Sequence, residues 1–158
     1  MTNYLIIPGL GNSGPKHWQT YFEESGENFI RIRQADWNAP VCEDWMAVID
    51  QAVMAFDPAT VVLIGHSLGC ITIAHWANRY RRLIKGAMLV APIDPEADIY
   101  TIPAKGFAPL SLDPIPFPTI VVASNNDIWV TPERARFFAA HWGSEFIDIG
   151  PAGHINAD

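Results

Sequence analysis

The sequence predicts a single α/β domain built on a doubly wound parallel sheet of six strands. Short apolar runs, rich in β-branched residues, alternate with segments whose apolar residues recur at helical spacing. A helix or a crossover loop separates successive runs, and such connections between parallel strands are right-handed. A chain of 158 residues can bury one substantial core but is short for two. We therefore expect residues 1–158 to form one three-layer domain, without a large cap domain.

Six short segments are expected to be the strands. The run at 119–123 is continuous and β-rich, which is typical of a strand that is covered on both faces. The segment 29–32 alternates apolar and basic residues, as an outer strand does. The predicted strands are residues 4–7, 29–32, 61–64, 86–90, 119–123 and 145–149.

Four segments are expected to be helices. Pro15 suits a first helical turn, and the aromatic residues that follow it recur at helical spacing. Apolar residues mark one face of 43–56, and Asp57-Pro58 ends that helix. Thr131-Pro132-Glu133 combines an N-cap, a first-turn proline and an early acid, which together open a helix. The first predicted helix begins after Pro15. The other three cover residues 43–56, 68–82 and 131–142.

The stretch from 91 to 118 is the irregular part of the chain. It holds seven of the thirteen prolines and shows no clear periodicity. A loop of this length inside a compact domain is uncommon and often functional. It leaves room for a short helix but is too brief for a separate cap domain.

Composition and charge exclude several classes of function. The formal net charge of −7 gives no electrostatic footprint for nucleic-acid binding. Cys42 and Cys70 lack metal-ligand spacing and are expected to be reduced and buried, so we expect no metal and no cofactor. The chain has no apolar run of membrane-span length, and its first residues lead into a strand without a signal-peptide pattern. We expect a cytoplasmic protein with no membrane partner.

The motif Gly65-His66-Ser67-Leu68-Gly69 lies between a predicted strand and a predicted helix. The pattern G-x-S-x-G is common by chance, but in this context it marks a tight turn that exposes the serine hydroxyl. Small residues are needed on both sides of such a turn, and the first N–H groups of the helix then point at the group that the serine attacks. We interpret Ser67 as a catalytic nucleophile, with the backbone N–H of Leu68 as an oxyanion donor.

Polar residues follow the other predicted strands, where ligands of open α/β sheets bind. Asp94 follows the fourth strand, Ser124-Asn125-Asn126-Asp127 the fifth, and His154 the last. A serine, an acid and a histidine in this order, each after a different strand, have the triad order of α/β-hydrolases. Asp94 and Asp127 are both candidates for the acid. Asp94 lies between prolines, as a turn residue does. We favour Asp127, on the grounds of its motif.

Six motifs occur in order along the chain: Gly9-Leu10-Gly11-Asn12-Ser13, His17-Trp18, Gly65-His66-Ser67-Leu68-Gly69, Val90-Ala91-Pro92, Ser124-Asn125-Asn126-Asp127 and Gly153-His154-Ile155-Asn156. Together they resemble the small serine hydrolases related to retinoblastoma-binding protein 9, and the resemblance spans nearly the whole chain. It implies a minimal α/β-hydrolase fold without the first two strands of larger hydrolases and without a large lid. It also implies a Ser67–Asp127–His154 triad, and Leu10 as the second oxyanion donor. Related proteins continue into a final helix, whereas only four residues follow His154 here, so that helix is missing or not included.

The remaining histidines and tryptophans have less specific roles. Trp129, two residues after the predicted acid, and His17, in a loop that faces the site, are possible substrate contacts. His66 is expected to be a packing and hydrogen-bonding residue rather than a base. His75 and His141 lie within predicted helices and are expected to be structural or solvent-facing.

The leading functional hypothesis is hydrolysis of small esters, or of similarly activated acyl substrates, through an acyl-Ser67 intermediate. The expected partner is a small-molecule acyl substrate, and the oligomeric state cannot be read from the sequence. The alternative is a weakly active or inactive protein-interaction module on the same fold. The L-x-C-x-E pattern that binds retinoblastoma-type pockets is missing, because Leu68-Gly69-Cys70-Ile71-Thr72 lacks the acid. Acyl transfer to an acceptor other than water would use the same residues.

Overall fold

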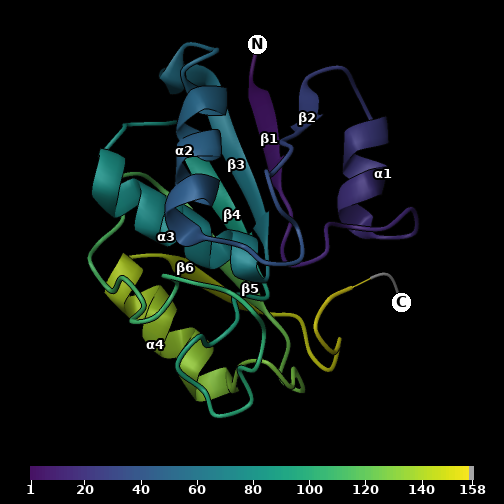
Figure 1. Ribbon diagram of the computed structural model, residues 1–158, viewed down its shortest axis with the longest axis vertical. Coiled ribbons are helices and arrows are strands. Elements are labelled where there is room, and N and C mark those ends of the chain that lie inside the picture. The colour runs from purple at the N-terminus through teal and green to yellow at the C-terminus, as the bar shows by residue number, and fades with distance from the viewer. Residues whose placement is uncertain (157–158) are drawn as a thin grey trace.

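The computed structural model describes residues 1–156, whose six strands form one parallel sheet (Figure 1). The strand order is β2-β1-β3-β4-β5-β6, and each neighbouring pair is parallel. The chain reverses its direction of travel across the sheet between β1 and β3, so the switch point lies there. The predicted doubly wound parallel sheet of six strands is thereby confirmed. The strands are β1 (Asn3–Ile7), β2 (Phe29–Arg31), β3 (Val61–His66), β4 (Gly86–Val90), β5 (Thr119–Ala123) and β6 (Glu145–Asp148).

Four helices cover the two faces of the sheet. The step from β1 to β2 crosses the sheet in the direction opposite to that of all later steps. Right-handed crossovers therefore place α1 on one face of the sheet, and α2, α3 and α4 on the other. Figure 1 shows α2 beside α3 and α1 on the far side of the strands. Among the described residues, no helix has both the length and the apolar composition needed to cross a bilayer. The helices are α1 (Trp18–Glu24), α2 (Cys42–Val53), α3 (Leu68–Tyr80) and α4 (Pro132–Trp142), with a short 3-10 helix at Pro58–Thr60.

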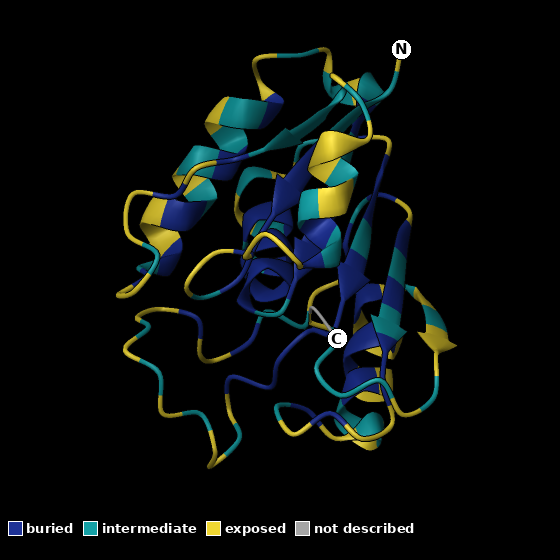
Figure 2. Ribbon diagram, turned by 90° about the vertical axis from the view of Figure 1, so that its right-hand side faces the viewer, coloured by how far each residue is buried: buried dark blue, intermediate teal, exposed yellow. Residues whose placement is uncertain are grey.

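The core lies mainly between the sheet and the helices α2, α3 and α4, where most of the buried residues gather (Figure 2). Helix α3 is buried along most of its length, because it packs on β3 and α2 at the centre of the fold. Trp45, Trp76 and Trp142 are almost fully buried, and truncation of such a side chain typically costs about 3–5 kcal/mol. Cys42 and Cys70 are free thiols in this core, as predicted.

The observed elements differ from the predicted ones mainly at their ends. Helix α1 begins at Trp18 with His17 as its N-cap, so Pro15 precedes the first turn instead of occupying it. Strand β3 extends through Gly65 and His66, because these two residues pair with Leu89 and Val90 of β4. The stretch 91–118 contains no helix and is ordered instead by burial of apolar side chains such as Phe107.

Candidate active site

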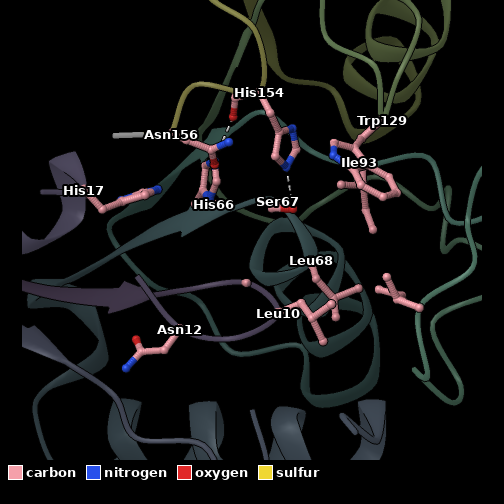
Figure 3. A pocket seen from close by; sticks show the side chains of 12 residues that line it. Leu10, Asn12, His17, His66, Ser67, Leu68, Ile93, Trp129, His154 and Asn156 are labelled. Carbon is pink, nitrogen blue, oxygen red and sulfur yellow. Dashed lines mark hydrogen bonds between the residues drawn. The ribbon is translucent and has the colours of Figure 1, made fainter. Parts of the chain in front are cut away.

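A cavity of about 200 Å³ opens at the carboxyl ends of the strands, beside the switch point (Figure 3). Its lining comes from the loops after β1, β3, β4, β5 and β6, including Leu10, Ser67, Ile93, Trp129 and His154. This is the position at which open α/β sheets bind their ligands. The cavity therefore collects residues from all the loops in which the sequence predicted functional groups.

Ser67 occupies a strained turn between β3 and α3. Its φ of 56° and ψ of −122° lie outside the regions that non-glycine residues usually adopt, at a typical cost of about 1–3 kcal/mol. The Ser67 N–H donates to the Val90 carbonyl at 3.0 Å, and the Ser67 carbonyl accepts the Cys70 N–H at 3.0 Å. The Ser67 side chain does not cap α3. Its hydroxyl faces the cavity (Figure 3).

Close approach of the backbone explains two of the motif glycines. A Cβ on Gly69 would lie 2.8 Å from the Pro8 carbonyl oxygen and would collide with that of Ile7. A Cβ on Gly9 would lie 3.0 Å from the Ser67 Cβ. The loop after β1 therefore packs directly against the turn that carries Ser67.

Ser67, His154 and Asp127 form a chain of short hydrogen bonds. The distance from Ser67 Oγ to His154 Nε2 is 2.7 Å, and that from His154 Nδ1 to Asp127 Oδ2 is 2.7 Å (Figure 3 shows the first). A carboxylate only accepts, so Nδ1–H donates to Asp127 and the Nε2 lone pair accepts the serine hydroxyl. The Asp127 side chain is fully buried, and its other oxygen accepts the Trp129 N–H at 2.8 Å. This arrangement can withdraw a proton from Ser67.

Asp94, the other candidate acid, has a different partner. Its Oδ2 accepts a hydrogen bond from Arg134 Nε at 2.8 Å, and Arg134 also pairs with Glu96 at 3.0 Å. The hydrogen bond that Arg134 donates to Asp94 raises the pKa of the Arg134 guanidinium. Of the two candidates, only Asp127 contacts His154.

The two predicted oxyanion donors lie together beside Ser67. Leu68 is the first residue of α3, where N–H groups have no partner within the helix. Leu10 lines the same cavity from the loop after β1, and Figure 3 places it next to Leu68. The cavity is thus bounded by two backbone segments that can present N–H groups.

Both predicted substrate contacts line the cavity. The Trp129 ring lies 6.3 Å from that of His154, centroid to centroid. His17 Nδ1 accepts the Gln19 N–H at 3.1 Å, so Nε2 carries the hydrogen in the neutral ring, and this buried nitrogen has no hydrogen-bond partner. Burial, followed by the charge of Arg31, lowers the pKa of His17 to about 4. His17 is therefore a neutral imidazole at ordinary pH.

Several residues at the site were not singled out from the sequence. Ile93 and Ile102, from the irregular stretch 91–118, form part of the apolar wall of the cavity. Trp18 was predicted as a helical residue and as part of the His17-Trp18 motif, without a role at the site, yet its Nε1–H donates to the Ile155 carbonyl at 3.0 Å. The motif was the available signal. His66 is a hydrogen-bonding residue, as predicted, with its Nε2 2.9 Å from the His154 carbonyl oxygen.

Comparisons with known proteins match the chain to one family model and to several solved structures. A family model described as "Serine hydrolase" matches residues 4–158. A crystal structure from Pectobacterium atrosepticum, described as a YdeN-like hydrolase, is 34% identical and has a TM-score of 0.87; the match covers 99% of this chain and 81% of that one.

More distant structures are similar in fold. The ydeN gene product of Bacillus subtilis is 16% identical with a TM-score of 0.78, over 99% of this chain and 89% of that one. Est1E from Butyrivibrio proteoclasticus, with ferulic acid bound, is 16% identical with a TM-score of 0.72. The match covers 99% of this chain and 82% of that one. No curated protein matches the chain. None of these descriptions mentions retinoblastoma-binding protein 9, so that relationship remains a prediction.

Proposed function

This chain belongs to the serine hydrolase family, and we propose that it cleaves small carboxylic esters, or similarly activated acyl compounds, through an acyl-Ser67 intermediate. The observation that carries the proposal is the pair of 2.7 Å contacts that join Ser67 to His154 and His154 to Asp127. A serine hydroxyl is a weak nucleophile by itself, and a hydrogen-bonded base activates it.

In the first step, Ser67 Oγ attacks the carbonyl carbon of the ester while His154 Nε2 takes the hydroxyl proton. The carbonyl π electrons move to the oxygen, where the backbone N–H groups of Leu68 and Leu10 stabilise the negative charge. When the tetrahedral intermediate collapses, the bond to the leaving oxygen breaks and His154 returns its proton to that oxygen. The acyl group is then bound to Ser67.

Water completes the cycle by the same route. His154 takes a proton from water, the resulting hydroxide attacks the acyl carbon, and the proton returns to Ser67 Oγ as the acid leaves. Asp127 holds the Nδ1–H tautomer of His154 and stabilises the imidazolium in both steps without being protonated itself. The roles of all three side chains follow from one hydrogen-bonded chain.

The size and lining of the cavity favour a short acyl group. Its volume of about 200 Å³ is smaller than the roughly 300–1,000 Å³ typical of sites for drug-sized ligands. Ile93 and Trp129 supply apolar surface near the serine (Figure 3), and Ile102 adds to the apolar lining of the cavity. A small, partly apolar acyl group therefore fits better than a long lipid chain.

The test combines covalent labelling with turnover. A fluorophosphonate probe should label the wild-type protein, and p-nitrophenyl acetate should be hydrolysed. Ser67→Ala should abolish both, whereas Ser25→Ala, which changes an exposed serine at the end of α1, should change neither. Labelling that survives in Ser67→Ala would refute the assignment of the nucleophile. A folded wild-type protein with neither labelling nor turnover would favour the protein-interaction alternative.

The acyl preference is tested with the same assay. A series of p-nitrophenyl esters from acetate to octanoate should show kcat/KM that falls as the chain exceeds the length the cavity accepts. A maximum at octanoate would contradict the proposed short-chain preference.

A further inference from the structure

The loop that carries His154, residues 150–156, is held on one side by the loop after β5. Ser124 Oγ accepts the Ala152 N–H at 2.9 Å, and Asn126 Oδ1 accepts the Gly153 N–H at 2.7 Å. The same β5 loop continues directly into Asp127. These contacts therefore set the histidine loop relative to the carboxylate, but not relative to the serine.

Two ring N–H groups hold the histidine loop on the opposite side. His66 Nε2–H donates to the His154 carbonyl at 2.9 Å, and Trp18 Nε1–H donates to the Ile155 carbonyl at 3.0 Å. The two carbonyls belong to consecutive residues. Between them the backbone is strained, because the β-branched Ile155 has a φ of 52°. A strained backbone of this kind persists only where surrounding contacts hold it.

Both donors are part of the framework that carries the nucleophile. His66 is the last residue of β3 and directly precedes Ser67. It is 4% exposed, and burial lowers its pKa to about 3, so the ring donates as a neutral imidazole. Trp18 opens α1, and the next residue, Gln19, donates from its amide to the Ile64 carbonyl of β3 at 3.1 Å. Both donors are therefore anchored to β3, which leads directly into the turn that carries Ser67.

We propose that Trp18 and His66 are positioning residues that hold the histidine loop so that His154 reaches Ser67 and Asp127 at the same time. The β5 loop sets the distance to Asp127, and the two ring donors set the distance to Ser67. This inference rests on the proposed function, because it assigns to these residues the placement of the base. Neither residue takes part in the proton transfers.

The test removes each donor while it preserves the packing. Trp18→Phe keeps an aromatic ring but has no N–H, and His66→Leu removes the ring donor. Misplacement of a reacting group by about 1 Å can lower the rate about a hundredfold. We expect kcat for p-nitrophenyl acetate to fall roughly ten- to a hundredfold in each variant, with KM within about twofold of the wild type. His66→Gln, which retains a side-chain N–H donor, should recover much of the loss.

The chain offers a matched control for each variant. Trp142 Nε1–H donates to the Ser111 carbonyl at 2.8 Å, and His75 Nε2 lies 2.9 Å from the Phe107 carbonyl oxygen, both away from the cavity lining. Trp142→Phe and His75→Leu therefore remove equivalent hydrogen bonds. They should lower Tm without lowering kcat by more than about twofold.

Crystal structures of the variants distinguish a positioning role from a general loss of stability. Trp18→Phe and His66→Leu should lengthen the distance from His154 Nε2 to Ser67 Oγ beyond hydrogen-bonding range. An unchanged distance, a rise in KM at constant kcat, or an equal loss of kcat in the controls would overturn the proposal. Wild-type protein without Ser67-dependent labelling would instead refute the proposed function, and the structural comparison would still test the placement of the loop.

Discussion

Two histidines buried as neutral rings should make the protein sensitive to mild acid. Burial lowers the pKa of His66 to about 3, and burial together with the charge of Arg31 lowers that of His17 to about 4. In the unfolded chain both imidazoles have a pKa of about 6.5. Between these values the unfolded state binds more protons than the folded state, so the free energy of unfolding falls as the pH falls. The full stability is present above about pH 6.5 and is lost from there down to the folded pKa values.

The magnitude follows from the size of this window. Each group loses about 1.4 kcal/mol per pH unit once the pH is below its unfolded pKa and above its folded pKa. Both folded values lie below 5, and His66 and His17 are only 4% and 6% exposed. From pH 6.5 to pH 5, each histidine therefore lowers the free energy of unfolding by about 1.5–2 kcal/mol, and the pair by about 3–4 kcal/mol. This is a large share of the roughly 5–15 kcal/mol that stabilises an ordinary domain.

Urea unfolding followed by tryptophan fluorescence measures this effect. The change in unfolding free energy between pH 6.5 and pH 5 should be about 1.5–2 kcal/mol smaller in His66→Gln than in the wild type. The difference between the two pH values is compared, because the substitution also shifts stability at both. His141→Gln, at an exposed position of α4, serves as the matched control. If the wild type and His66→Gln lose the same free energy over this range, the assignment of a buried neutral imidazole is refuted.

Further substitutions test other parts of the site. Asp127→Asn should lower kcat by about 10³- to 10⁴-fold while the protein stays folded, because the amide no longer selects the required His154 tautomer. Asp94→Asn should keep kcat within about threefold. It should lower the unfolding free energy by about 1–3 kcal/mol, since it breaks a buried ion pair. A larger fall in kcat would make Asp94 a candidate acid again. Gly69→Ala should lower stability by about 1–3 kcal/mol, seen in Tm, together with turnover, because the new methyl group meets the carbonyl oxygens after β1. Ile102→Ala should shift the preference among p-nitrophenyl esters toward longer acyl chains, and an unchanged profile would show that this residue does not limit the cavity.

Local patterns were sufficient for most elements of the fold. The strands were predictable within about two residues, because a parallel sheet buried on both faces requires continuous apolar runs. The end of β3 was missed, since Gly65 and His66 belong to a turn motif and are strand residues only through pairing with the neighbouring strands β1 and β4. The stretch 91–118 has no period to detect. Its order comes from individual side chains such as Phe107 packing on distant parts of the core.

The sequence by itself determined the fold class, Ser67 as the candidate nucleophile and His154 as the candidate base, because each depends on a motif at the end of a predicted strand. Only the tertiary structure decided which carboxylate meets His154. Asp94 and Asp127 both follow strands that end at the same edge of the sheet, and Arg134, forty residues from Asp94, takes that carboxylate. The contacts of Trp18 and His66 with the histidine loop were equally hidden. They join residues 137 and 88 positions apart, and local sequence carries no information on which distant carbonyls a ring N–H will reach.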